Sequence, residues 1–264
     1  MDFRAHVYSP LQNQALWLAA TLYGEASFDD ADYALTELGG PQRFEDEEYG
    51  LAPLIRQIRS FNSGFMDSFS SQPALSLTLA GPGTPVGLPA ASAAAGLATG
   101  AGGAIVLASE RARAYAAAVP LYGQGGTQWR WFELEGYPPA PAYLSPGEAD
   151  FLLTTATREA AELIERMGPI ATDLPNPRLT VGTLSDFYDT PGLPSSIAPR
   201  AAKLIARADR VSAIIETVTA RINDHTFDPG LLSLGRHIRQ ARMSAVTYAT
   251  VEWARVYDRN LHAR

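Results

Sequence analysis

The stretch PRAAKLIARADRVSAIIETVTARI, residues 199–222, decides the fold because its apolar residues recur every three or four positions. Such a register forms one face of an amphipathic helix. Its members are Ala201, Leu204, Ala208, Val211, Ile215, Val218 and Ile222. After a loop at 223–227, Asp228 and Pro229 begin a second helix in which the register resumes. Two long helices joined by a short loop predict an antiparallel helical hairpin at the C-terminus.

A third helix is predicted before this hairpin, with the clearest start signal in the chain. Ser145 is a capping residue, Pro146 suits the first helical position, and Glu148 completes a capping box. Its apolar residues also recur at helical spacing, so the helix can join the hairpin as a third member of a bundle.

The middle of the chain predicts β structure. Leucines alternate with small polar residues at 75–79, as expected of a half-buried strand, and three more strand-like runs follow. The four expected strands are Leu75–Leu79, Gly103–Ala108, Arg113–Leu121 and Thr127–Leu134. Because their connections are mostly too short for crossover helices, they predict an antiparallel meander.

Together these patterns predict an α+β protein: a four-stranded antiparallel β-meander flanked by helices, followed by the long helical hairpin. The stiff run at 136–141, GYPPAP, separates the two. We therefore expect N-terminal helices plus the meander in residues 1–144 and a helical bundle in residues 145–264, with the two parts able to pack as one domain.

The composition excludes several classes of protein. The chain has 264 residues, of which 46% are apolar and 19% charged, so we expect a packed core and not a disordered chain. It contains no cysteine, which excludes disulfide frameworks, thiol nucleophiles and thiolate zinc sites. Its first residues do not resemble a secretory signal, and the uncharged stretch 88–107 is too rich in alanine and glycine for a transmembrane helix. We therefore expect a cytoplasmic protein without membrane contact.

Charge is divided unevenly along the chain. Residues 1–198 carry 10 basic and 22 acidic side chains, whereas residues 199–264 carry 11 basic and 6 acidic ones. Such asymmetry can mark an interaction surface. In the hairpin the basic residues form one row on each helix, and we expect the rows to merge into one face that binds carboxylates or phosphates. The rows are Arg200, Lys203, Arg207 and Arg210, and then Arg236, Arg239 and Arg242.

Several occupants suit such a face, and the sequence leaves them open. The arginines can pair with the acidic N-terminal third of the same chain or stay solvated, or they can hold a small anionic metabolite. They can instead bind an acidic protein partner or a second copy of the chain, which predicts a non-enzymatic interaction or regulatory protein. Nucleic acid is disfavoured, because the pI is about 5.1 and no aromatic residues interleave with the arginines.

Motifs for a known catalytic mechanism are absent from the sequence, and nothing in it predicts a metal or a cofactor. A Gly/Pro loop at 81–89 follows a strand but lacks the spacing of a dinucleotide-binding loop. Its candidate residues are Gly81, Gly83 and Gly87. With the carboxylates of Asp186 and Asp189, this loop carries the alternative hypothesis of a small-molecule-binding protein or a hydrolase-like enzyme.

Three further features have simple structural explanations. The pair Asp224-His225 precedes a helix start, as loop residues do, and the acidic run Glu45–Glu48 is expected to be a solvated loop. Trp129 and Trp131 alternate on one strand, so we expect both to pack against the sheet; an exposed tryptophan pair would instead be an interaction hot spot.

Overall fold

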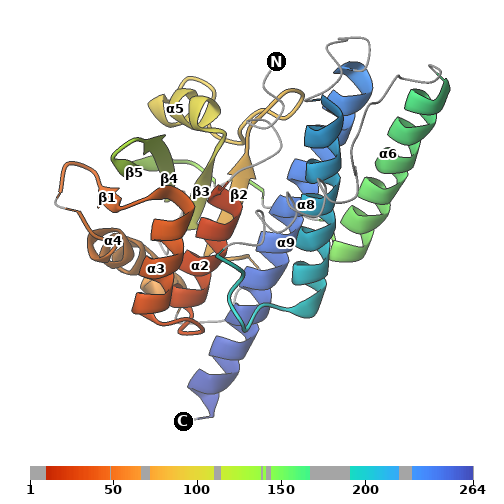
Figure 1. Cartoon of the computed structure of the whole chain (residues 1–264). Helices are drawn as coiled ribbons and strands as arrows, with labels where there is room; N and C mark the ends of the chain where they lie inside the picture. The colour runs from red at the N-terminus through yellow and green to blue at the C-terminus, as the bar shows by residue number, and fades with distance from the viewer. Residues whose placement is uncertain are drawn as a thin grey trace.

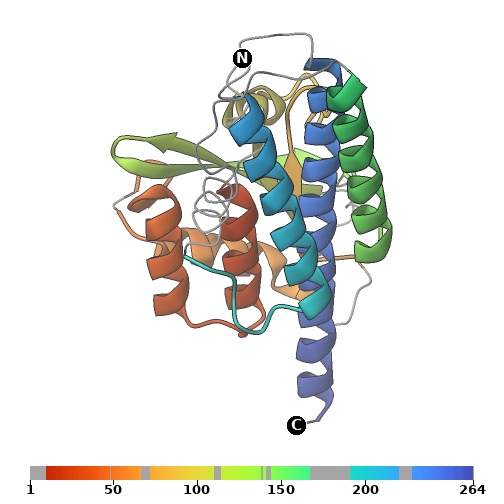
Figure 2. The ribbon, with the colours of Figure 1, turned by 45° about the vertical axis from the view of Figure 1, so that its right-hand side comes forward.

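The chain folds around one five-stranded sheet. A computed structural model describes residues 10–47, 49–66, 72–109, 114–137, 139–140, 144–166, 191–219 and 228–263. The strands are β1 (Gln42–Phe44), β2 (Leu75–Leu79), β3 (Gly103–Ala108), β4 (Ala114–Gly123) and β5 (Gly126–Glu135). Their spatial order is β1-β5-β4-β3-β2, and β2 to β5 pair antiparallel with their neighbours in sequence. In Figure 2 the long β4–β5 hairpin extends to the left, away from the C-terminal helix.

The expectation of a four-stranded antiparallel meander is wrong. The fifth strand, β1, pairs in parallel with β5, with Gln42 opposite Thr127 and Phe44 opposite Trp129, so the sheet is mixed. β1 is only three residues long, too short for a detectable alternation of apolar and polar residues. Tertiary contacts hold it instead: the Trp129 Nε1–H donates to Gln42 Oε1 at 2.8 Å, and the Thr127 N–H donates to the Pro41 carbonyl at 3.0 Å.

Helices cover both faces of the sheet. They are α2 (Leu11–Leu22), α3 (Phe28–Gly39), α4 (Ala52–Asn62) and α5 (Ala93–Ala101). α2 and α4 pack on one face with α3 beside them, and α5 packs on the other face against β3 and β4 (Figure 1). Because both faces are covered, every residue of β2 and β3 is buried.

Helix α5 lies in the alanine- and glycine-rich stretch where the sequence analysis placed no element. Ser92 caps its start by accepting the Ala95 N–H at 3.1 Å, and Gly102 ends it in the left-handed conformation, at φ +83°. Alanine has the highest helix propensity of any residue, which offsets the weakening effect of the glycines inside the helix.

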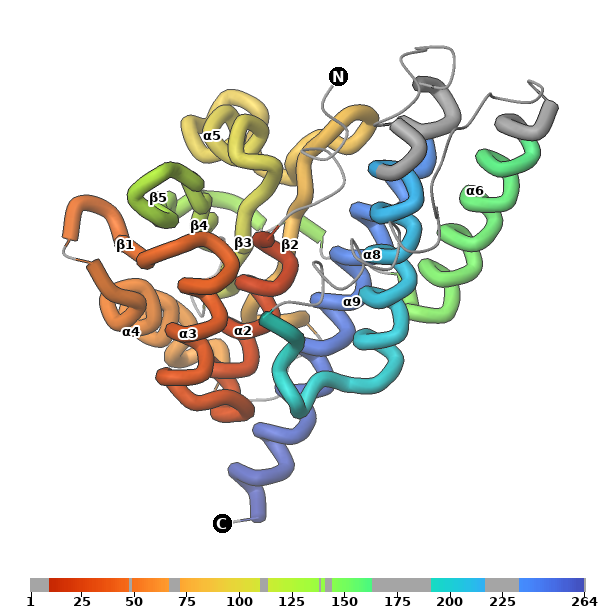
Figure 3. The backbone as a smooth tube through the Cα atoms, viewed as in Figure 1, coloured from red at the N-terminus to blue at the C-terminus, as the bar shows by residue number. Residues whose placement is uncertain are grey.

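Three further helices form a layer beside the sheet. They are α6 (Pro146–Arg166), α8 (Pro199–Thr219) and α9 (Asp228–His262). α6 and α8 both pack along α9, and two views show the three helices side by side (Figures 1 and 2). α9 has 35 residues, about 52 Å at 1.5 Å per residue, and Figure 3 follows it past the sheet to the C-terminus. None of the helices in the described part of the chain is both long and apolar enough to cross a membrane.

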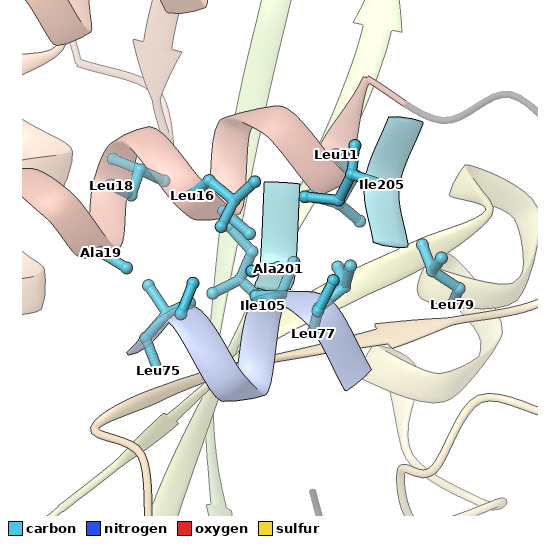
Figure 4. Close-up of a cluster of buried hydrophobic side chains, with 14 of the residues drawn as sticks. Leu11, Leu16, Leu18, Ala19, Leu75, Leu77, Leu79, Ile105, Ala201 and Ile205 are labelled. Carbon is cyan, nitrogen blue, oxygen red and sulfur yellow. The ribbon is translucent and has the colours of Figure 1, made fainter. Parts of the chain in front are cut away.

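The largest core lies where the helical layer meets the sheet. Leucines of α2 and β2 meet residues of β3 and α8 in one cluster of buried apolar side chains (Figure 4). The residues labelled there are Leu11, Leu16, Leu18, Ala19, Leu75, Leu77, Leu79, Ile105, Ala201 and Ile205. α9 lies along the same cluster and contacts both β2 and α2, so it connects the bundle to the sheet.

Candidate functional site: a cationic groove

The row of basic residues on α8 is exposed and borders a groove between α6 and α8. The groove has a volume of about 920 Å³. The basic side chains that line it are Arg158, Arg200, Lys203, Arg207 and Arg210. Its apolar lining includes Ala161, Leu204, Val211 and Ile214. We call this surface the cationic groove.

The cationic groove exists because α6 and α8 turn their main apolar stripes toward α9. Leu153 and Ala156 of α6 are buried in the core that α9 shares. The neighbouring stripe of α6, which faces α8, carries short side chains such as Gly147, Thr154 and Ala161. Short side chains on this stripe leave the space between the two helices unfilled.

One ion pair spans the cationic groove. Arg207 Nε lies 2.8 Å from Asp150 Oδ1, and the Arg207 NH1 group donates to Thr154 Oγ1 at 2.6 Å. Among the described residues that line the groove, Asp150 is the one carboxylate, against five cations. The groove therefore keeps an excess of positive charge, which attracts acidic groups.

The second row, on α9, does not join this surface. Arg242 is 2% exposed, its NH2 group lies 2.8 Å from Asp209 Oδ1, and the same group donates to Ser212 Oγ at 3.1 Å. This buried ion pair links α9 to α8, so Arg242 has a role inside the fold.

Arg239 is also buried, at 3% exposure, but on the side of α9 that faces the sheet. Its NH2 group donates to the Pro82 carbonyl at 2.6 Å and to Thr84 Oγ1 at 3.0 Å, and burial lowers the pKa of the guanidinium. A Cβ on Gly81 would lie 2.7 Å from Arg239 Cζ, so only glycine fits there without displacement. Arg239 thus holds the Gly/Pro loop against α9.

The two rows therefore do not merge into one exposed face. This outcome contradicts the expectation from the sequence. The reason is the spacing on α9. Arg236, Arg239 and Arg242 are three residues apart, and each such step turns by about 60° around a helix of 3.6 residues per turn. The row consequently passes from the exposed Arg236 to the buried Arg239 and Arg242. The 3-4-3 spacing on α8 stays on one face.

The described residues of the acidic N-terminal region, one of the occupants that the sequence left open, do not cover the cationic groove. The acidic residues between Glu25 and Glu47 lie on and around α3 and β1. In both views α3 lies on the opposite side of the molecule from α6 (Figures 1 and 2). Part of this acidic segment pairs locally instead, since Glu45 Oε2 lies 3.3 Å from Arg130 Nε.

A second cavity lies between the Gly/Pro loop, strand β2 and helix α9, and we call it the loop pocket. It has a volume of about 440 Å³. Gly83 and Gly87 line it, as do Arg236 and Gln240 from α9, whereas Gly81 packs against Arg239. The loop predicted from the sequence therefore borders a cavity.

The remaining predicted residues are structural or lie outside the described residues. Trp129 is fully buried, and Trp131 makes an edge-on contact with Phe61 at 5.4 Å, so this pair packs inside the fold. Asp186, Asp189, Asp224, His225 and Glu48 lie outside the described residues. Within those residues no cluster of potential metal ligands occurs.

Sequence reasoning missed the α6 side of the cationic groove and with it Arg158. A signal was present, because residues 147, 150, 154, 157 and 161 recur at 3-4-3-4 spacing and are short or polar. The α9 side of the loop pocket was also missed. Arg236, Gln240 and Met243 follow one another at 4-3 spacing and so share a helix face.

Comparison with known proteins shows which family the chain matches. Residues 12–143 match the N-terminal domain, and residues 147–243 the C-terminal domain, of the Rv1486c-like proteins. A curated relative, "Uncharacterized protein MT1533" of Mycobacterium tuberculosis (strain CDC 1551 / Oshkosh), is 31% identical over 129 residues, which is 45% of this chain and 44% of the relative. No solved structure shows significant similarity. The two matches cover most of the sequence, and the chain belongs to the Rv1486c-like family.

Proposed function

We propose that this protein is a non-enzymatic interaction protein whose cationic groove binds an acidic amphipathic helix of a protein partner. The observation that carries the proposal is the combination, in one groove, of apolar side chains with five basic ones. Laying the apolar face of a helix into a groove is a recurrent mode of recognition. Acidic residues flanking that face would then meet the arginines, which bind carboxylates through two parallel hydrogen bonds.

The length of the cationic groove suits such a helix. Its lining residues run from Pro146 to Ala161 on α6 and from Arg200 to Ile214 on α8. At 1.5 Å per residue this length is about 22 Å, or four turns of helix. A partner helix with apolar residues at i, i+3, i+4 and i+7 would bury them on the apolar lining.

The distribution of charge supports a ligand from outside the chain as the occupant of the cationic groove. The acidic segment around α3 lies away from the cationic groove, so the basic side chains keep their attraction for another molecule. A second copy of this chain, presenting its own acidic α3, is the competing occupant, and duplex DNA is a weaker one. The experiment below separates these three.

The test uses synthetic peptides and the full chain. One fluorescent 18-residue peptide has leucines at i, i+3, i+4 and i+7 and glutamates beside them; a second has glutamine for every glutamate; a third has the composition of the first in scrambled order. We expect the acidic amphipathic peptide to bind at least tenfold more tightly than either control in fluorescence anisotropy. We also expect its binding to weaken with added salt, because exposed charges are screened.

Variants locate the binding. Changing Arg200, Lys203 and Arg210 to Glu should weaken binding at least tenfold, since each lost pair contributes about 0.2–1 kcal/mol and each new carboxylate repels the peptide. A matched control changes the exposed Arg56, Arg255 and Arg259 to Glu and alters net charge equally; it should leave binding within about twofold.

Three results would count against the proposal. Equal binding of all three peptides would remove the acidic helix as the preferred occupant. Concentration-dependent association in sedimentation velocity, abolished by the groove variant and spared by the control, would make a second copy the occupant. Duplex DNA binding at low salt, lost in the groove variant and stronger than peptide binding, would make the surface a phosphate-binding one.

A further inference from the structure

One wall of the loop pocket is β2, the edge strand of the sheet in the described part of the chain. The Ala80 N–H donates to the Gly102 carbonyl, and the Ala74 carbonyl accepts the Ala108 N–H, so even-numbered residues of β2 face β3. The backbone groups of Leu77 and Leu79 therefore point away from β3 and toward α9. There the Leu79 N–H donates a hydrogen bond to Met243 Sδ at 3.3 Å. Leu77 itself is one of the residues that line the loop pocket.

Side chains add a defined chemistry to the loop pocket. Among the described residues that line it, Arg236 is the one that is charged at neutral pH, and it is exposed at the mouth. Gln240 lies one turn further along α9 and supplies an amide. Thr78 Oγ1 accepts the Gly87 N–H at 3.1 Å, which leaves its hydroxyl proton able to donate. The rest of the lining is mainly apolar, including Val106, Pro139 and Met243.

Hydrogen bonds fix the Gly/Pro loop that forms one wall of this pocket. Two hydrogen bonds between Gly81 and Thr84, at 3.0 and 2.8 Å, close the turn. Arg239 of α9 stabilises that turn by donating hydrogen bonds to the Pro82 carbonyl and the Thr84 hydroxyl. Arg239 is thus a positioning residue for the pocket, and Arg236 is the residue that would contact a ligand.

We propose that the loop pocket binds a small organic carboxylate with an apolar body. The volume of about 440 Å³ is in the usual range for small-molecule sites. One guanidinium beside neutral donors matches a single negative charge, and so a carboxylate better than a dianionic phosphate. The apolar lining would take the body of the ligand, and the Leu77 backbone and Gln240 would bind a second polar group. This site is separate from the cationic groove and does not depend on the function proposed for it.

The experiment uses the full chain and three carboxylates: 4-phenylbutyrate, octanoate and indole-3-propionate. For each, the alcohol of the same carbon skeleton is the neutral control, and phenyl phosphate tests the alternative anion. Ligand-observed NMR detects binding, and isothermal titration calorimetry gives the dissociation constant. We expect at least one carboxylate to bind at least tenfold more tightly than its alcohol and more tightly than phenyl phosphate.

Variants place that binding in the loop pocket. Arg236→Gln should weaken it at least tenfold and Arg236→Lys should restore part of it, while Arg200→Gln, which removes the same charge from the cationic groove, should leave it unchanged. Ala140→Trp, at the exposed rim, should block entry while thermal unfolding shows an intact fold. No carboxylate binding up to about 10 mM, no preference over the alcohol, or full binding by Arg236→Gln would overturn the proposal. Preference for phenyl phosphate would replace carboxylate by phosphate as the ligand class and so overturn it as stated.

Discussion

Replacing Asp209 by alanine removes the carboxylate that faces Arg242 across a 2.8 Å ion pair between α8 and α9. The two side chains are only 6% and 2% exposed, so water cannot take the place of the lost partner. The Arg242 guanidinium would keep its hydrogen bond to Ser212 but lose the buried carboxylate that lies 2.8 Å from it. The perturbation therefore tests whether the ion pair of Arg242, a residue that the sequence predicted to bind a partner, holds the helical layer together.

The magnitude follows from burial more than from distance. Two unit charges 2.8 Å apart attract by about 6 kcal/mol at an effective dielectric constant of 20, and desolvation offsets much of this gain. Removing one member of a buried pair costs about 3–5 kcal/mol, whereas replacing both by apolar residues is often close to neutral. Because a whole protein is stable by about 5–15 kcal/mol, Asp209→Ala should remove about a fifth of the total or more.

Urea unfolding followed by circular dichroism and tryptophan fluorescence measures these differences. We expect Asp209→Ala and Arg242→Met each to lower the free energy of unfolding by about 3–5 kcal/mol, and Asp209→Leu with Arg242→Met to lower it by about 1 kcal/mol or less. Asp150→Ala, which breaks the half-exposed pair with Arg207, is the control and should cost less than about 1 kcal/mol. Equal losses for the Asp209 and Asp150 variants, or a double variant as costly as the two singles together, would refute the reasoning.

Three other predictions concern the backbone and the core. Gly81→Ala puts a Cβ 2.7 Å from Arg239 Cζ, so we expect a loss of about 1–3 kcal/mol in urea unfolding; an unchanged midpoint would mean that Arg239 does not hold the loop. Gly126→Ala forces φ +112° on a residue with a Cβ and sets that atom against the Pro41 carbonyl, so we expect a loss of about 2–4 kcal/mol and faster hydrogen exchange in β1; slow exchange there would contradict this. Burial raises the pKa of Tyr23 to about 12, so its neutral phenol stabilises the fold fully below about pH 10, and about 3 kcal/mol is lost as the pH rises from 10 to 12. Tyr23→Phe should flatten the unfolding free energy over that pH range, and an unaltered slope would assign the effect to other groups.

Strong periodicity explains which elements could be predicted from the sequence. The alternation of Leu75, Leu77 and Leu79 marks a strand, and the register from Ala201 to Ile215 marks a helix, because burial on one face imposes these periods. β1 has three residues and no period, and its pairing depends on Trp129, 87 residues away in sequence. The mixed sheet could not be inferred without that tertiary contact.

The same distinction, between what helical periodicity predicts and what tertiary contacts decide, applies to the candidate site residues. A 3-4-3 spacing keeps the α8 cations on one face, so their exposure follows from helix geometry alone. Which way the α9 arginines point depends on what α9 packs against, and that is α8 on one side and β2 with its loop on another. The sequence predicted the Gly/Pro loop as a candidate, but the α9 residues that complete its pocket are about 150 positions away along the chain.

The course of α9 has a consequence for dissecting the protein. This one continuous helix packs against α6 and α8, contacts the edge strand β2 and lines the pocket of the Gly/Pro loop. A fragment ending near residue 143 would lack this helix and would present β2 as a bare edge, the kind of surface through which chains aggregate. The N-terminal half made alone should therefore precipitate or form oligomers, and adding the separate C-terminal half during refolding should rescue it.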